Sequence, residues 1–418
     1  MQLLIKNVRI NDGLTEQKPV DILISNGIIT DIAVNIEPPA GADVWDTGGA
    51  LASPGWFDTG VQVCDPGHEH REDIQSALNA AAAGGFTGIA CFANTTPAIH
   101  SKSEVLYVRN RAQSCNSPVE LYPVGALSQN CDGKDLAELI DMHHAGAVAF
   151  SDGYRAVQDA GLLLRALQYA RAFDGLIMNR PNHKTVAAGG QMHEGIMSTS
   201  LGLKGIPALA EELMVQRDLS LLEYTGGRLH LHLISTAKSV EMIRNAKARG
   251  LSVTCSAAAV NLCFSDEMMA EFDSNWKVMP PLRSSPDVEA LQSAVADGTI
   301  DFICSNHTPW HEEAKNLEFP YAEFGMSGLE TAFSLCLTHS NLPVELLIRK
   351  FALAPRSVLG LPLPAVKKGE KANLTVFDPE AIWKYTNPES RSANSPFIGK
   401  ELKGRVLGVV NQQRVVRN

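Results

Sequence analysis

Short hydrophobic runs alternate with amphipathic segments through most of the chain. The amphipathic segments, such as DIQSALNAAAAGG and AKSVEMIRNAKARG, show helical spacing, and several end in glycine, as helix C-termini often do. The hydrophobic runs are expected to be strands, and they cover residues 55–63, 87–93, 119–125, 146–151, 175–179, 228–235, 251–256 and 300–305. Eight strand–helix units predict an α/β fold, a (β/α)8 barrel, in which active sites lie at the carboxyl ends of the strands.

The two ends of the chain have a different pattern, in which short apolar runs are separated by turn signals. Near the N-terminus, LLIKNVRI and VDILISNGIITDIAV are interrupted by Asn-Asp-Gly and Ser-Asn-Gly, which favour hairpins. Near the C-terminus, GEKANLTVFDPE and GRVLGVVNQQRVVRN show the same pattern. The sequence therefore predicts a small discontinuous β-sandwich from residues 1–53 and 366–418, beside a barrel over 54–365.

Composition narrows the class of protein. The 418 residues are 45% hydrophobic and 20% charged, as in globular proteins. The net charge of −10 without a basic stripe argues against a nucleic-acid partner. No apolar run reaches the roughly 18 residues that span a bilayer, and MQLLIKNVRINDG does not resemble a signal peptide. Without a spanning segment or a signal peptide, we expect no membrane partner and a cytoplasmic location. The eight cysteines contain no C-x-x-C, so we expect them to be buried thiols.

Several ordered segments resemble the type I dihydroorotases of the amidohydrolase superfamily, over nearly the whole chain. They are DPGHEHREDI (65–74), FANTTP (92–97), AAGGQMHEG (187–195), LGLKGIPALAEE (201–212), GRLHLHLISTAKSV (227–240), KVMPPLR (277–283), DGTIDFICSNHTPW (297–310) and GMSGLETAF (325–333). The resemblance implies a barrel of the metal-dependent hydrolase type with a small β-sandwich. It also implies a reaction of pyrimidine biosynthesis, in which carbamoyl-aspartate closes reversibly to dihydroorotate. In that family a zinc-bound hydroxide attacks the ring amide, and an aspartate at the eighth strand moves the proton.

The first strand departs from the family pattern, Asp-x-His-x-His followed two residues later by a substrate-binding arginine. Asp58 is kept, but Gly60 and Gln62 stand at the histidine positions and Cys64 at the arginine position. Glycine has no ligand atom, and a neutral amide is a poor zinc ligand. A thiol cannot form the two-pronged ion pair that arginine makes with a carboxylate.

The other ligand positions are altered as well. Arg180 occupies a metal-ligand position after the fifth strand, and a cation there would repel a metal ion. Leu233 replaces the ligand histidine of the sixth strand, next to His232. Since side chains alternate faces along a strand, His232 is expected to point away from the barrel axis if Leu233 points inward. Asp152, in a Ser-Asp-Gly one acidic residue shorter than the family motif, is either a remaining ligand or a simple strand-end turn.

The position of the family's catalytic base and most of its substrate-contact positions are also changed in this sequence. Asn306 stands where the family has its aspartate base, and an amide does not titrate near neutrality. Trp310 and Met279 replace a histidine and an asparagine that contact substrate in the family, whereas Asn94 is kept. We therefore predict a catalytically inactive homologue without a metal or other cofactor. Its expected role is structural, as a homo-oligomer that also binds aspartate transcarbamoylase, as inactive homologues do in some bacteria.

Two other readings stay open at this point. A relocated metal site, in an active dihydroorotase or a related cyclic-amide hydrolase, could use His68 and His70 with His307 and His311. A metal-free hydrolase could use Cys64 as a nucleophile with a loop histidine as its base. The simpler interpretation is a polar loop and an inert buried thiol.

Overall fold

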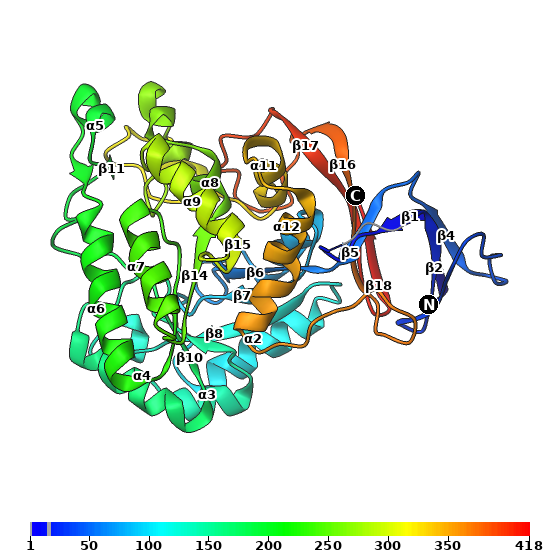
Figure 1. The fold of residues 1–418 in the computed structure, drawn as a ribbon, viewed down its shortest axis with the longest axis horizontal. Coiled ribbons are helices and arrows are strands. Elements are labelled where there is room, and N and C mark those ends of the chain that lie inside the picture. The colour runs from blue at the N-terminus through cyan, green and yellow to red at the C-terminus, as the bar shows by residue number, and fades with distance from the viewer. Residues whose placement is uncertain (1, 15–17) are drawn as a thin grey trace.

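The structure is a computed structural model that describes residues 2–14 and 18–418. Its larger part is an eight-stranded parallel sheet, nearly closed into a barrel and surrounded by helices (Figure 1). In sheet order, its strands are β15 (Phe302–Cys304), β14 (Val253–Ala258), β13 (Arg228–Leu231), β10 (Leu176–Asn179), β9 (Ala149–Phe150), β8 (Glu120–Gly125), β7 (Phe86–Cys91) and β6 (Trp56–Val61). The eight strands fall within, or within one or two residues of, the runs expected from the sequence.

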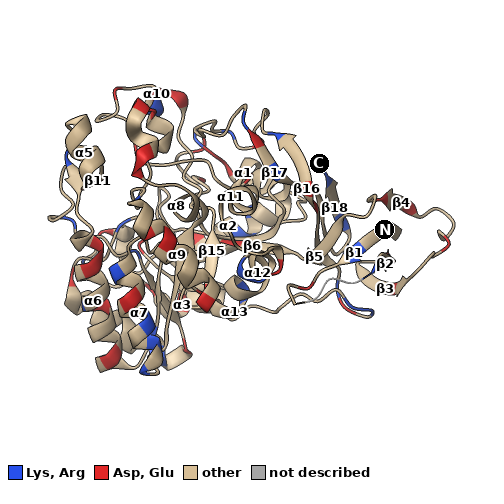
Figure 2. Ribbon diagram, turned by 45° about the horizontal axis from the view of Figure 1, so that its top comes forward, with Lys and Arg blue, Asp and Glu red and all other residues tan. Residues whose placement is uncertain are grey.

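Helices cover the outside of this sheet. Those that follow strands are α1 (Ile74–Ala83), α2 (Lys102–Ser114), α3 (Leu139–Ala145), α4 (Ala160–Ala170), α6 (Leu209–Thr225), α7 (Ala237–Ala248) and α9 (Ser285–Asp297), with α11 (Ala332–His339), α12 (Val344–Ile348) and α13 (Ala354–Val358) after the last strand. Shorter elements lie in the connections: α5 (Ile196–Leu201), α8 (Ala259–Cys263), α10 (Glu312–Lys315), β11 (Met192–His193) and β12 (Gly205–Ile206). Acidic and basic side chains are mixed over the outer helices α6 and α7 (Figure 2).

The barrel closes between its first and last strands through polar contacts. The backbone N–H of Gln62 donates to the carbonyl of His307 at 3.2 Å. The carboxylate of Asp58 accepts from the backbone N–H of Ser305 at 2.9 Å and also from its hydroxyl. The interior of the barrel is filled by a cluster of buried side chains, which include Phe57, Ala90, Phe92, Val124, Ala149, Leu176 and Met178.

A second sheet stands beside the barrel and contains both chain termini (Figure 1). Its strands are β1 (Gln2–Ile10), β2 (Val20–Ser25), β3 (Ile28–Ala33), β4 (Asp43–Asp46), β5 (Leu51–Pro54), β16 (Asn373–Lys384), β17 (Glu401–Asn411) and β18 (Arg414–Arg417). The order is β18-β17-β16-β5-β1-β2-β3, with β4 paired to β1. Because β5 pairs antiparallel with β16, strands from both ends of the chain lie in one sheet. The expected barrel with a separate β domain is confirmed, and where a β-sandwich was expected the domain is one connected eight-stranded sheet.

Aromatic packing joins the two parts. Trp56, the first residue of β6, stacks on Phe333 at 4.0 Å between ring centroids and lies 5.1 Å from Phe377 of β16. Its backbone N–H donates to the hydroxyl of Thr375 at 3.2 Å. All of the cysteines are free thiols; six are buried, and Cys115 and Cys263 are half-buried. In the described part of the chain, no helix is both long and apolar enough to cross a membrane.

Candidate functional site

The carboxyl ends of the barrel strands surround a pocket of about 350 Å³. Four of the positions singled out in the sequence line it: Gln62, Arg180, Met279 and Trp310. A neighbouring pocket of about 660 Å³ contains Asp152 and shares Met279 with the first. The fold therefore collects these positions at one mouth, although they come from distant parts of the sequence.

Gly60 lies where a histidine would have no room. Its φ is +80°, and a Cβ atom built on it would lie 2.5 Å from Nε2 of His232 and 2.7 Å from the ring of Phe92. The buried rings of His232 and Phe92 meet edge to face at 5.1 Å. The side chain of His232 therefore points into the barrel, and the expectation that it faces away is wrong.

The reason lies in where the sixth strand ends. Strand β13 stops at Leu231, and Leu233 has a left-handed backbone with φ 62°, so strict alternation does not extend to it. Leu233 packs in an apolar cluster with Ala258 and Cys304, and it has no donor atom for a metal. Burial, and then the charges of His230 and Arg180, hold the pKa of His232 well below its usual range. Its Nδ1 lies 3.0 Å from the hydroxyl of Ser256, and its Nε2 has no partner among the described residues.

Gln62 and Cys64 are engaged in local contacts. The Gln62 amide donates to the hydroxyl of Thr308 at 3.3 Å, and its oxygen accepts from Arg71 at 3.5 Å. Cys64 is buried, and desolvation raises the pKa of its thiol to about 12. A thiol that stays protonated at neutral pH is a poor nucleophile, so the environment of Cys64 does not favour a cysteine hydrolase.

Arg180 follows the last residue of β10 and is 6% exposed. Its Nε and Nη2 atoms have no hydrogen-bond partner in the described part of the chain. Burial lowers the pKa of the guanidinium to about 10, against the opposing influence of Cys304 and Glu211. It therefore remains a cation at neutral pH, placed where the family resemblance puts a metal ligand.

Asp152 serves the local structure. Its carboxylate accepts from the backbone N–H of Ser128 at 2.8 Å and from the Ser128 hydroxyl at 2.6 Å. Burial raises the pKa of Asp152, against these hydrogen bonds. The amide of Asn94 donates to the Asp152 carbonyl at 3.0 Å, and its oxygen accepts from the N–H of Tyr154 at 3.2 Å. These contacts agree with the strand-end interpretation of Asp152, and they tie Asn94 to the same turn.

The positions after the last strand are also held by the protein itself. Asn306, with φ 55°, donates to the carbonyl of Met279 at 3.1 Å. The indole of Trp310 donates to the carbonyl of Phe324 at 3.0 Å. The guanidinium of Arg71 lies over the Trp310 ring, 3.5 Å from its centroid. Sequence reasoning missed Arg71; its signal was its place inside DPGHEHRED, one of the segments that carry the resemblance.

Two other buried carboxylates around the barrel, Glu211 and Glu72, already have donors. Glu211 accepts from the backbone N–H groups of Ser235 and Thr236 at 3.0 and 3.1 Å. Glu72 accepts from the Ser390 hydroxyl and lies 3.3 Å from Nε2 of His307. These carboxylates hold neighbouring segments in place through their hydrogen bonds, so their oxygens are not free to bind a metal.

The residues at the mouth do not fit zinc. Glycine, glutamine, arginine, leucine and asparagine stand at the metal and base positions, and zinc prefers thiolate, imidazole and carboxylate. His70 lies 5.3 Å from His311 and 6.3 Å from His68, measured between ring centroids. Among the described residues, no group of three or more His, Cys, Asp or Glu side chains is arranged to hold a metal ion.

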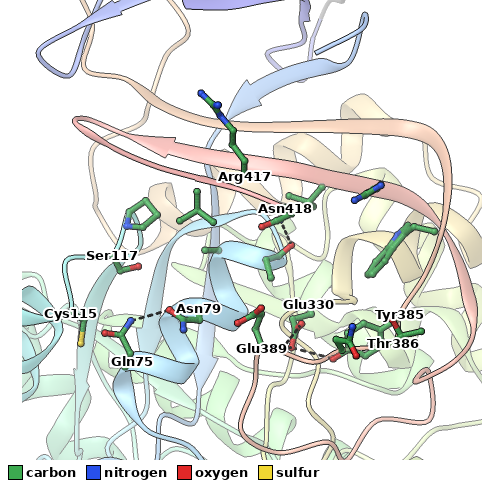
Figure 3. A pocket seen from close by; sticks show the side chains of 18 of the residues that line it. Gln75, Asn79, Cys115, Ser117, Glu330, Tyr385, Thr386, Glu389, Arg417 and Asn418 are labelled. Carbon is green, nitrogen blue, oxygen red and sulfur yellow. Dashed lines mark hydrogen bonds between the residues drawn. The ribbon is translucent and has the colours of Figure 1, made fainter. Parts of the chain in front are cut away.

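Another pocket, of about 570 Å³, lies against the side of the barrel (Figure 3). Gln75 and Asn79 of α1 line one side, and Glu330, Tyr385 and Arg417 line others. None of its lining residues is a site position singled out in the sequence, so the mouth of the barrel remains the candidate functional site.

Comparison with known proteins shows the family of this chain. The family model described as "Dihydro-orotase-like" matches residues 49–239. A dihydroorotase of Pelotomaculum thermopropionicum is 42% identical over 100% of both chains. The chain belongs to the dihydroorotase family. A family relative from Syntrophus aciditrophicus, also named dihydroorotase, is 40% identical over 100% of this chain and 99% of its own.

Solved structures of the wider fold are similar in shape. An L-hydantoinase of Arthrobacter aurescens has a TM-score of 0.87 at 24% identity, covering 100% of this chain and 96% of its own. A D-hydantoinase of Thermus sp. has a TM-score of 0.80 at 20% identity, covering 100% and 97%. At these identities the likeness establishes the fold of this dihydroorotase-family chain and nothing about its substrate.

Proposed function

We propose that this dihydroorotase homologue has lost the family's metal-dependent hydrolysis and serves as a structural subunit of an assembly. The observation that carries the proposal is Arg180, a buried guanidinium in the position of a metal ligand. A fixed positive charge in the lining of the mouth opposes the binding of a divalent cation. Histidine or carboxylate could be neutral or anionic there, whereas arginine stays charged.

The other changed positions support the same conclusion. Gly60 leaves no space for a larger side chain beside His232, and Leu233 is packed among apolar side chains. Asn306 cannot act as a base. Because a hydrolase of this kind needs the metal, the bound hydroxide and the base together, loss of several parts removes far more activity than loss of one.

An assembly role would explain why a large fold persists without catalysis. Most mutations destabilise proteins, so a chain without any selected role would lose its fold. The proposed partners are further copies of this chain and aspartate transcarbamoylase, which would place it in pyrimidine biosynthesis and in the cytoplasm. Such interfaces bury more than about 1,000 Å² of surface.

The loss of catalysis is tested with purified protein and both substrates of the reversible reaction. We expect no conversion of carbamoyl-aspartate or dihydroorotate above background, with or without added zinc, and no stoichiometric metal by elemental analysis. Asn306→Asp alone should restore nothing, because the metal donors remain absent. The Pelotomaculum thermopropionicum relative, assayed in parallel, is the positive control. Turnover that a chelator abolishes would overturn the proposal.

The assembly role is tested separately by size-exclusion chromatography with light scattering. The chain is measured alone and mixed with the aspartate transcarbamoylase of the same organism. We expect a self-associated species and a larger mixed complex, with a change in transcarbamoylase activity. A monomer that forms no complex and leaves that activity unchanged would contradict the assembly role, whatever the result of the catalytic assay.

A further inference from the structure

Two cysteines outside the candidate site lie against each other where α8 meets α11. Cys263 is the last residue of α8, and Cys336 lies within α11. The thiol of Cys263 donates to the carbonyl of Leu335 at 3.4 Å, and Leu335 is bonded directly to Cys336. Cys263 also packs against the buried cluster that contains Cys336. Burial, and then a hydrogen bond and the charge of Cys336, raises the pKa of the Cys263 thiol well above its ordinary value.

The surrounding packing holds both sides of this contact in place. The ring of Phe264, which follows Cys263, lies 4.8 Å from the ring of His339 on α11, between centroids. Helix α11 is in turn fixed to β17, because the hydroxyl of Ser334 donates to the carbonyl of Gly404 at 2.6 Å. The two thiols therefore stay together as long as the helices remain packed.

The two thiols differ in their access to solvent. Cys263 is half-buried, whereas Cys336 is fully buried. A small oxidant can therefore reach the sulfur of Cys263 but not that of Cys336. The raised pKa keeps the Cys263 thiolate scarce at neutral pH, so its oxidation is slow compared with that of an activated cysteine. Once Cys263 is oxidised to a sulfenic acid, a second thiol is already in contact with it, and sulfenic acids condense with thiols to disulfides.

We propose that Cys263 and Cys336 form a reversible disulfide when the protein meets hydrogen peroxide. In the first step, the sulfur of Cys263 attacks one peroxide oxygen, the O–O bond breaks, and a sulfenic acid and one water form. In the second step, the sulfur of Cys336 attacks the sulfur of Cys263, the S–O bond breaks, and hydroxide leaves as water with the proton of Cys336. One peroxide is reduced to two waters, and two thiols are oxidised to one disulfide.

The bridge would strengthen the joint between the barrel and the second sheet. It links the helix that follows β14 to the helix that is hydrogen-bonded to β17, across a long stretch of chain. A disulfide stabilises mainly by restricting the unfolded chain, and the effect grows with the length of the closed loop. The oxidised protein should therefore unfold at a higher urea concentration than the reduced protein. The proposal is independent of the barrel mouth and of the assembly role.

Thiol counting after peroxide treatment tests the proposal. The full-length protein is treated with hydrogen peroxide and then catalase, and its free thiols are counted with Ellman's reagent after unfolding. We expect the count to fall from eight to six, the mass to fall by about 2 Da, and dithiothreitol to reverse both changes. A peptide map should show Cys263 linked to Cys336. A count that stays at eight would mean that the pair serves apolar packing only, and a disulfide between other cysteines would overturn the assignment.

Variants then separate this pair from the other thiols. Cys263→Ser should keep its seven remaining thiols and show no rise in the urea midpoint on treatment. Cys115→Ser is the matched control, because Cys115 is also half-buried, and it should still lose two thiols. In Cys336→Ser, Cys263 should gain oxygen without forming a disulfide, which keeps the test open if one variant fails to fold. A loss of two thiols in Cys263→Ser would contradict the proposal.

Discussion

At the scale of single residues, the mouth of this barrel differs from the family pattern in the size of its side chains as well as in their charge. Gly60 has a left-handed φ of +80° and lies against His232 and Phe92. Glycine there meets two requirements at once, since an L side chain would be strained by the backbone and obstructed by the rings. The position has become part of the packed interior.

Gly60→Ala should therefore lower the free energy of unfolding more than the same substitution at a left-handed glycine with open space around it. The backbone costs about 1 kcal/mol, and insertion of a methyl group against packed rings adds about 1–3 kcal/mol. Gly133→Ala is the matched control, because its φ is +75° and no described atom lies within 4 Å of a built Cβ. Urea unfolding of both variants measures the difference. Equal losses in free energy of unfolding would show that His232 and Phe92 move aside freely.

At the scale of elements, the closure of the barrel depends on a buried carboxyl group. Asp58 on β6 accepts from the backbone and the hydroxyl of Ser305, which follows β15. Burial raises the pKa of Asp58 to about 6, in opposition to those hydrogen bonds. The joint between the first and last strands is therefore sensitive to pH.

The sign follows from the raised pKa. The folded protein holds the proton more tightly than the unfolded chain, so the stabilisation is full below the unfolded pKa of 3.8 and is lost as pH rises through about 6. At about 1.4 kcal/mol per pKa unit, the loss is roughly 3 kcal/mol. Relative to Asp58→Asn, the unmodified protein should lose about 2.4 kcal/mol of free energy of unfolding between pH 4 and pH 7, because the unfolded carboxyl group is already partly ionised at pH 4. Urea titrations of both proteins across that range measure it.

Asp31 is the control for this pH effect, because its contribution to stability should change with pH in the opposite direction. Asp31 is partly exposed, and a hydrogen bond from Lys368, together with its charge, lowers the pKa of Asp31. Its contribution is therefore present above the unfolded pKa and is lost as pH falls. Relative to Asp31→Asn, the unmodified protein should gain a little stability as pH rises. A difference between the unmodified protein and Asp58→Asn that stays constant with pH would refute the role given to Asp58.

At the scale of the whole molecule, barrel and β domain share one aromatic cluster. Phe377 of β16 is fully buried and lies 5.1 Å from both Trp56 of the barrel and Phe333 of α11, between ring centroids. A cluster built from both parts couples their stabilities, so the chain should unfold in one cooperative transition.

Phe377→Ala should lower the stability of the entire chain by about 3–5 kcal/mol, the usual cost of emptying an aromatic core position. Ile382→Ala on the same strand is the control, because Ile382 is 71% exposed and should change stability by less than about 0.5 kcal/mol. Circular dichroism and tryptophan fluorescence should report coincident transitions that shift together in Phe377→Ala. A second transition that keeps its midpoint would mean that the two parts unfold independently.

The sequence alone determined the strand positions of the barrel and the pairing of the two chain ends into a second sheet. It also determined which donor atoms are absent, because Gly60, Arg180 and Leu233 lack metal-binding groups in any conformation. Tertiary structure decided where the remaining side chains point. His232 faces inward because β13 ends just before it, and Arg180 is unsatisfied because the nearby acid is bound elsewhere. Side-chain chemistry is local, whereas orientation and hydrogen-bond partners depend on residues that only folding brings together.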